Sequence, residues 1–244
     1  MGTITELVGP AAAGKTQMCL ALTAEVVVTG RGEGIGVVYL DLDGHFQARR
    51  LCRLIETALK RHGASESAES LMFRVNVLQA QGWEEFVGCL QRLPALLREF
   101  PAQLVILDSI ANPALQFEHG VVARQQELIG HAALLKSLAV EHNLAVVITN
   151  RTFGRHRDNW SEVEENDAML GNSWAHCVNV RLAIKVAQSA DARRPLTTYP
   201  SQVGVMKVKK AHYCSESSFE FVIGEEGFAS CGGLDYTIVD GEFI

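Results

Sequence analysis

An eight-residue stretch near the N-terminus, Gly9-Pro-Ala-Ala-Ala-Gly14-Lys15-Thr16, constrains this chain more than any other feature. It has the form G-x-x-x-x-G-K-T, follows the apolar run Ile4 to Val8, and precedes a helix-like run, Gln17 to Val26. Strand, glycine-containing loop and helix in this order are typical of a phosphate-binding loop. The glycines permit a tight turn in which successive N–H groups face one anion, and the helix N-terminus adds its positive end. We therefore expect a nucleoside triphosphate site, with Lys15 on the β- and γ-phosphates and the Thr16 hydroxyl on Mg²⁺. The expected nucleotide-binding residues of this stretch are Gly9, Pro10, Ala11, Ala12, Ala13, Gly14, Lys15, Thr16 and Gln17.

Strand-like and helix-like runs alternate after this loop, which argues for a mostly parallel sheet covered by helices on both faces. Strands are predicted at 37–41, 72–78, 103–108 and 144–149, helices at 46–62, 83–100 and 125–142, and a loop at 63–70. Pro94 should kink or divide the second of these helices. Residues 151–170 are polar and aperiodic, and the strand-like runs 178–186, 203–210 and 219–223 follow without a helix between them. The predicted fold class is therefore α/β, a twisted, mostly parallel sheet with an antiparallel C-terminal extension.

Composition limits the kind of protein that carries this loop. With 244 residues, 48% of them hydrophobic, the chain can bury the core of one α/β domain. No apolar run reaches about 18 residues, so we expect no membrane span. The net charge of −6 excludes a broadly basic nucleic-acid surface but allows local basic loops. The 6 cysteines are scattered, which favours reduced thiols in an intracellular compartment over a zinc site or a disulfide framework.

Carboxylates follow two of the predicted strands. Asp108 ends a run of four apolar residues and is expected to hold Mg²⁺ through water. Ligands bind at the carboxyl ends of strands in open α/β sheets, so Gly9, Asp108 and the Asp41/Asp43 pair should converge on one edge. One of the pair could position an attacking water as a general base, although capping of the following helix is an alternative or additional role. Arg50, one turn into that helix, could lie against the base of the nucleotide or simply face solvent.

Further motifs occur in a recognisable order: Val38-Tyr-Leu-Asp-Leu-Asp-Gly-His-Phe46, Leu104-Val-Ile-Leu-Asp-Ser109, Val147-Ile-Thr-Asn150 and Leu170-Gly-Asn-Ser-Trp-Ala-His176. With the loop, they resemble the RecA-type recombination ATPases, in the eukaryotic branch around the strand-exchange recombinase. The last motif is the most discriminating, because generic phosphate-loop ATPases lack it. Within the branch, 170–182 looks most like the B-type recombinase paralog, and 3–20 and 74–108 look like its D-type sibling.

The resemblance implies a RecA-like ATPase domain over residues 1–230. From the composition we expect an acidic, flexible tail at 231–244, and we expect no N-terminal helical domain. It implies ATP and Mg²⁺ as ligands, with Lys15, Thr16 and Asp108 matching the nucleotide and metal residues. Lys15 and Asp43 stand at catalytic positions, and Arg50 matches an arginine that packs on adenine.

The resemblance also assigns interfaces. Residues 111–124 and 151–169 match the two loops that face single-stranded DNA in this family. Lys210 lies near a segment that caps ATP on a neighbouring subunit.

Several departures from the family pattern bear on activity. Asp43 stands where active recombinases carry glutamate, and its carboxylate is retracted by about 1.5 Å. A misplacement of about 1 Å can cost on the order of 100-fold in rate. Arg151 replaces the glutamine that relays nucleotide state to the DNA loop, and the cap proline is absent near His212. The chain begins directly at the first strand, as either a trimmed core or a protein that does not polymerise in the usual way.

The second loop has the composition that single-stranded DNA requires. Its arginines, Arg151, Arg155 and Arg157, alternate with aromatic rings that bases can stack on. Four carboxylates follow between 162 and 167 and would repel phosphate, so a solvated loop is the alternative. We expect weak or partner-assisted binding of single-stranded DNA.

The sequence thus favours a nuclear recombinase paralog that binds ATP and hydrolyses it slowly. It would act in a hetero-oligomer with other paralogs and the recombinase, assisting filament assembly on single-stranded DNA, and would not bind membranes. The alternatives are a self-filamenting strand-exchange ATPase and a nucleotide-locked scaffold without turnover. A small-molecule kinase is disfavoured because no acceptor-pocket signature is visible.

Overall fold

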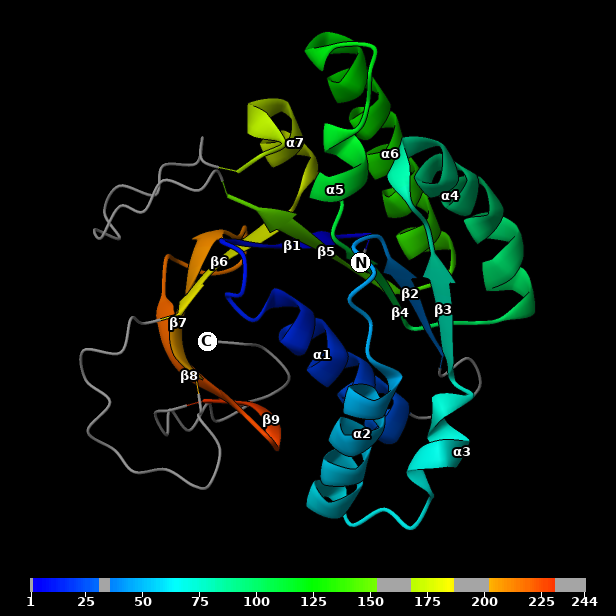
Figure 1. Cartoon of the computed structure of the whole chain (residues 1–244), viewed down its shortest axis with the longest axis vertical. Helices are drawn as coiled ribbons and strands as arrows, with labels where there is room; N and C mark the ends of the chain where they lie inside the picture. The colour runs from blue at the N-terminus through cyan, green and yellow to red at the C-terminus, as the bar shows by residue number, and fades with distance from the viewer. Residues whose placement is uncertain (1, 31–35, 153–167, 187–201, 231–244) are drawn as a thin grey trace.

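The structure, a computed structural model, describes residues 2–30, 36–152, 168–186 and 202–230. Within these residues one sheet has the strand order β3-β2-β4-β5-β1-β6-β7-β8-β9 (Figure 1). Its strands are β1 Ile4–Gly9, β2 Val37–Asp41, β3 Val75–Gln79, β4 Leu104–Asp108, β5 Ala145–Arg151, β6 Val180–Val186, β7 Gln202–Lys210, β8 Ser218–Gly224 and β9 Gly227–Ser230. Strands β3 to β6 of this order pair in parallel, and β6 to β9 pair antiparallel. The predicted parallel sheet and its antiparallel extension are both confirmed.

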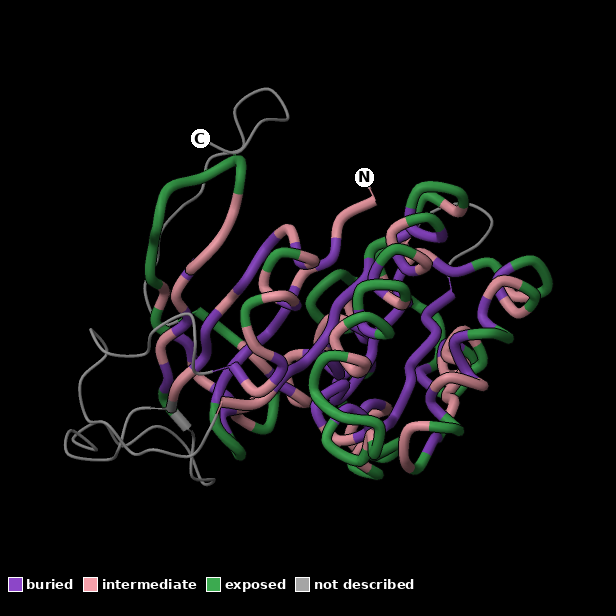
Figure 2. The backbone as a smooth tube through the Cα atoms, turned by 90° about the horizontal axis from the view of Figure 1, so that it is seen from above, coloured by how far each residue is buried: buried purple, intermediate pink, exposed green. Residues whose placement is uncertain are grey.

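Helices cover both faces of the sheet. They are α1 Lys15–Thr29, α2 Ala48–His62, α3 Ala68–Met72, α4 Gly82–Glu99, α5 Ala111–Leu115, α6 Val121–Glu141 and α7 Gly171–Cys177. The first three lie on one side and the other four on the opposite side (Figure 1). Each layer closes its own apolar core against the sheet, and the strands between them are the most buried part of the chain (Figure 2).

Burial follows the sequence patterns that predicted these elements. Every residue of β2 and of β4 is buried, as expected for strands that are covered on both faces. The apolar face predicted for the helix at 46–62 is buried in α2: Leu51, Leu54, Ile55, Ala58 and Leu59. Helix α4 continues through Pro94 instead of dividing there.

Some boundaries differ from the prediction. Residues 68–72, assigned to a loop and to the start of a strand, form α3, because the Ser67 side chain accepts a hydrogen bond from the Ser70 N–H and caps it. Part of the first expected DNA loop is helical, since α5 spans Ala111–Leu115 and α6 begins at Val121 rather than 125. Helix α7 and strand β9 are too short to leave a periodic signal. No helix within the described residues is long and apolar enough to span a membrane.

A buried polar cluster holds the middle of the sheet together. Glu6 on β1 is fully buried and accepts hydrogen bonds from Asn150 and Trp174, at 2.8 Å each, and from Arg181 Nε at 2.6 Å. Asn150 lies on β5, Trp174 on α7 and Arg181 on β6. One carboxylate therefore ties together both ends of the segment between β5 and α7 and the strand that leads into the phosphate-binding loop.

Candidate nucleotide-binding site

The loop between β1 and α1 has the backbone of an anion site. Ala12 (φ 60°) and Gly14 (φ 92°) adopt left-handed conformations, and Gly14 is the N-cap of α1. Gly9 is tightly packed, because a Cβ there would lie 2.2 Å from the Ile184 carbonyl oxygen of β6. Helix α1 has no side-chain cap and no acidic residue in its first turn. Its leading N–H groups are therefore left for an external acceptor, and a phosphate fits them.

Lys15 folds back over this loop. Its ammonium donates to the carbonyl oxygens of Gly9 (2.8 Å) and Pro10 (2.7 Å), and the residue is 8% exposed. Burial lowers the Lys15 pKa to about 8, partly offset by Asp108 and Asp43. The cation is thus already at the loop, where incoming phosphates would replace its carbonyl partners.

Asp108 ends β4 next to the loop, as predicted, and is 3% exposed. Its two carboxylate oxygens accept hydrogen bonds from the hydroxyls of Tyr39 (2.7 Å) and Thr149 (2.5 Å). Burial, with further contributions from Cys19 and Asp108, raises the Tyr39 pKa, so this phenol stays a donor. These two donors fix the orientation of Asp108, and its contact with water on Mg²⁺ stays a prediction.

The site residues fit a nucleotide-borne Mg²⁺ better than a resident metal. Thr16 is half-buried in the first turn of α1, and Asp108 lies at the same edge of the sheet. No group of three or more His, Cys, Asp or Glu side chains within the described residues could hold a metal ion. Mg²⁺ commonly binds through one or two protein groups plus substrate phosphates, which matches this donor set.

Asp41, the last residue of β2, and Asp43, two residues further on, make different contacts. Asp41 accepts hydrogen bonds from the backbone N–H groups of His45 (3.0 Å) and Phe46 (3.2 Å) and so closes the turn before α2. Helix α2 itself begins at Ala48 and has no side-chain cap, so Asp41 stabilises the turn before the helix and does not cap the helix as weighed for the pair. Asp43 instead forms an ion pair with Arg151, with 2.5 Å between Oδ2 and Nη2. Asp43, expected at the general-base position, and Arg151, which replaces the relay glutamine, therefore form an ion pair with each other.

Arg50 bridges three elements. Its Nε donates to the Gln17 side chain at 2.9 Å, and its terminal nitrogens donate to the carbonyl oxygens of Gly224 (2.7 Å) and Glu225 (2.6 Å). Arg50 thus joins α1, the helix that follows the phosphate-binding loop, and α2 to the β8–β9 turn. Packing of its guanidinium on adenine stays a prediction.

The expected interface residues are placed only in part. Lys210 donates to the carbonyl oxygens of Ala175 (2.9 Å) and Val178 (2.6 Å), at the C-terminal end of α7. Arg155 and Arg157 lie outside the described residues. Contacts of these residues with DNA or a neighbouring subunit stay predictions.

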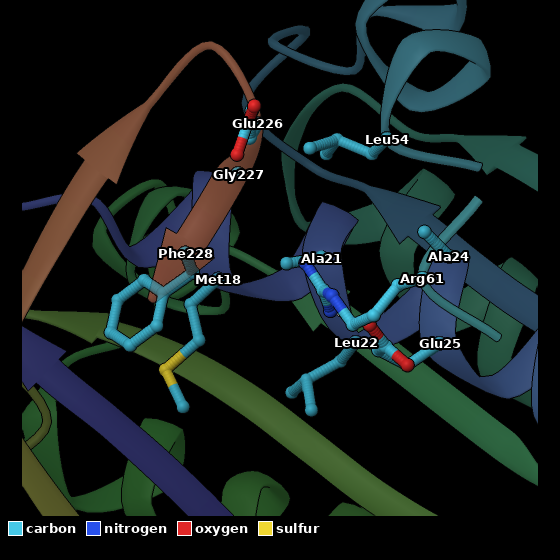
Figure 3. A pocket seen from close by; sticks show the side chains of 10 residues that line it. All are labelled: Met18, Ala21, Leu22, Ala24, Glu25, Leu54, Arg61, Glu226, Gly227 and Phe228. Atoms are coloured by element: carbon cyan, nitrogen blue, oxygen red, sulfur yellow. The ribbon is translucent and has the colours of Figure 1, made fainter. Parts of the chain in front are cut away.

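A separate hollow of about 150 Å³ lies between α1, α2 and the start of β9 (Figure 3). Apolar side chains, among them Met18, Leu22 and Phe228, line it beside the Arg61–Glu25 ion pair. None of the predicted site residues lines this hollow, so it is not part of the nucleotide site.

Sequence reasoning missed the residues that hold the site from behind. Tyr39 orients Asp108, but the sequence pattern indicated only that it belongs to a buried strand. Glu6 could have been found, because a carboxylate inside the apolar run Ile4–Val8 requires a buried partner. Its partner Arg181 lies 175 positions away, beyond the reach of any local pattern.

Comparison with known proteins places the chain among recombination proteins. A family model described as Rad51 matches residues 1–230. The chain is 30% identical over 206 residues to "DNA repair protein RAD51 homolog 2" of Arabidopsis thaliana, covering 75% of this chain and 55% of that protein. It is 30% identical over 246 residues to the Mus musculus protein of the same name, covering 84% of this chain and 68% of that protein. It is 29% identical over 249 residues to "DNA repair protein XRCC3" of Bos taurus, and the match covers 94% of this chain and 69% of that protein.

Proposed function

Since the chain belongs to the Rad51 family, we propose that it is a recombinase paralog that binds ATP with Mg²⁺ and hydrolyses it slowly. It acts within a hetero-oligomer of paralogs that assists assembly of the recombinase filament on single-stranded DNA, in homologous-recombination repair in the nucleus. The names of its relatives, DNA repair protein RAD51 homolog 2 and XRCC3, support the repair role. The first of these names also agrees with the B-type resemblance of residues 170–182.

One observation carries the proposal. Lys15 folds onto the loop and Asp108 is oriented beside it, which supports nucleotide binding, while Asp43 is paired with Arg151. A carboxylate oxygen that already accepts a hydrogen bond from a guanidinium is not available to accept the proton of an attacking water, so the pair disfavours general-base catalysis by Asp43. This combination supports tight nucleotide binding with slow turnover.

The Asp43–Arg151 pair also favours a second candidate, a nucleotide-locked scaffold without turnover. Measuring ADP formation by the native chain and by Lys15→Ala distinguishes the slow ATPase from the scaffold. Faster hydrolysis by the native chain supports the slow ATPase. Equal rates, with ATP binding lost only in Lys15→Ala, support the scaffold.

Assembly is the test of the hetero-oligomer. We expect light scattering after size exclusion to show a discrete complex of this chain with recombinase paralogs. The complex should form with ATP and the native chain, and weaken without ATP or with Lys15→Ala. A long homogeneous filament of this chain alone would instead support a self-filamenting strand-exchange ATPase.

A further inference from the structure

The hollow between α1, α2 and β9 has an apolar floor that is partly open to solvent. Met18 and Leu22 of α1 and Phe228 of β9 line it and are each only half-buried, and its volume is about 150 Å³. In Figure 3 Phe228 and Met18 lie at one side of the hollow, and Arg61 and Glu25 lie at the other. A cavity of about this volume, lined by apolar side chains, accommodates one aromatic ring. The hollow therefore fits a single large apolar side chain.

The rim of the hollow carries charges of both signs. Arg61 is paired with Glu25, and a second carboxylate, that of Glu226, also lines the hollow. Net charge therefore does not select an occupant. Apolar contact and backbone pairing have to hold it, with its polar groups facing water at the rim.

Strand β9 lies at one end of the sheet in the described part of the chain, where it pairs with β8. An end strand presents backbone N–H and C=O groups with which another extended segment can pair. Phe228 on this strand stacks on Phe221 of β8, with 4.5 Å between the ring centroids, so its side chain lies on the face of the sheet that packs on α1. A segment that pairs with β9 would run beside the hollow, with alternate side chains directed to that face.

The chain itself supplies such a segment directly after β9. Residues 231–244 lie outside the described residues and begin with Cys231-Gly232-Gly233, followed by Leu234-Asp-Tyr-Thr-Ile-Val239. Three-residue hairpin loops favour glycine at their last, left-handed position, where Gly233 stands. The run after it is rich in β-branched and aromatic residues, which favour a strand. The sequence after β9 thus has the pattern of a hairpin.

The hydrophobic pattern of this run selects one register. With the loop at 231–233, Tyr236 comes opposite Phe228, and residues opposite each other in an antiparallel pair share a face. Leu234, Tyr236 and Ile238 would then face α1 together with Phe228. A two-residue loop at 232–233 would instead put Thr237 opposite Phe228 and turn Asp235 to the apolar face. A one-residue slip exchanges the two faces of a strand, so apolar burial favours the longer loop.

We propose that residues 234–239 form a further strand on the outer edge of β9 and that the Tyr236 ring fills the hollow between α1 and α2. The ring suits the site because its body is apolar and its hydroxyl can face the charged rim. Only a short loop separates the segment from β9, so ordering it costs little loop-closure entropy. The hairpin fastens β9 to both helices. This goes beyond the proposed function, since neither ATP nor DNA takes part.

Hydrogen exchange on the full chain, followed amide by amide over 234–239, tests the strand and its register. Exchange in the native chain should be slower than in Tyr236→Ala by about tenfold or more, because pairing with β9 protects these amides. Ile238→Ala should have an effect in the same direction. Thr237→Ala and Val239→Ala are the matched controls, because their side chains face the other way, and each should change the exchange by less than about twofold.

The hollow is tested from the opposite side by Ala21→Phe. Ala21 lines the hollow from α1, so the added ring occupies the space proposed for Tyr236. Exchange over 234–239 should rise to the rate in Tyr236→Ala, while the circular dichroism of the folded chain stays the same. Ala95→Phe is the matched control, because Ala95 is exposed on α4 in the opposite helix layer (Figure 1). It should leave the exchange of the segment unchanged.

Four outcomes would overturn the inference. Exchange in the native chain as fast as in Tyr236→Ala would mean a free tail, as the composition alone predicts. Equal effects of all four alanine variants would mean that the segment has no strand register. Protection that persists in Ala21→Phe would mean docking elsewhere, and protection that is lost on dilution would mean that a second copy supplies the segment. None of these outcomes bears on ATP binding, so the proposed function is judged separately.

Discussion

We expect burial of a single side chain, Lys15, to make the proposed nucleotide binding depend on pH. Desolvation lowers its pKa to about 8 in the free protein, and Arg151 lowers it further while Asp108, Asp43 and Cys19 act in the opposite direction. A bound phosphate favours the charged ammonium, so the pKa of Lys15 is higher in the complex. Affinity for Mg-ATP should therefore be constant below about pH 8 and fall by up to about tenfold per pH unit above it. Calorimetry at pH 7, 8 and 9 measures this.

The proton balance gives that prediction a control. Above pH 8, titrations in buffers of different ionisation enthalpy should reveal uptake of up to one proton on binding. Lys15→Ala should lose measurable ATP binding and, with it, the proton uptake. An affinity that stays level to pH 9.5 in the native chain would mean that Lys15 does not titrate in this range.

Gly9 is required by close packing rather than by an unusual backbone angle. In Gly9→Ala the added Cβ would lie 2.2 Å from the Ile184 carbonyl oxygen, so β6 or the loop has to move. We expect a loss of about 1–3 kcal/mol in unfolding free energy, with weaker ATP binding. Gly88→Ala is the matched control, because its Cβ would meet nothing within 4 Å and α4 should gain about 0.5–1 kcal/mol. Urea unfolding compares them, and equal stabilities would contradict the packing account.

At the scale of elements, the Glu6 cluster links the strand before the loop to both flanks of the second expected DNA loop. Glu6→Gln can still accept hydrogen bonds from Asn150 and Trp174 but cannot neutralise Arg181. Because the substitution breaks a buried ion pair, we expect a loss of about 3–5 kcal/mol in unfolding free energy. Glu99→Gln, exposed on α4, should change the unfolding free energy by less than about 0.5 kcal/mol. A loss below about 1 kcal/mol for Glu6→Gln would show that the pair contributes little.

Helices and strands with a clear hydrophobic pattern were predictable from the sequence, whereas the shortest helices and strands were not. Continuous apolar runs predicted β2 and β4. The spacing of apolar residues predicted the buried face of α2, because burial on a helix repeats every 3.6 residues. Helices α3, α5 and α7 are two turns or shorter. Of these three, α3 is capped by the Ser67 side chain, whereas α5 and α7 have no side-chain cap and depend on tertiary contacts. Strand β9 depends on pairing with β8, which no local pattern records.

The parts of the candidate site that lie in one short sequence motif or at a strand end were predictable from the sequence. The loop, Lys15 and Asp108 follow from a motif and from the rule that parallel strands end at one edge. The Asp43–Arg151 pair did not follow, since it joins residues 108 positions apart across β4. Arg151 was assigned to DNA from the composition of its loop, and only the folded sheet shows its contact with the base position.

At the scale of the whole molecule, we propose that the site binds ATP tightly but hydrolyses it slowly because Arg151 holds Asp43 in an ion pair. Single-turnover hydrolysis by the full chain, with and without single-stranded DNA, measures this most directly. We expect near-stoichiometric ATP binding, slow hydrolysis that DNA accelerates only a few-fold, and no binding by Lys15→Ala. Rapid hydrolysis that DNA stimulates strongly in the isolated chain would contradict the account.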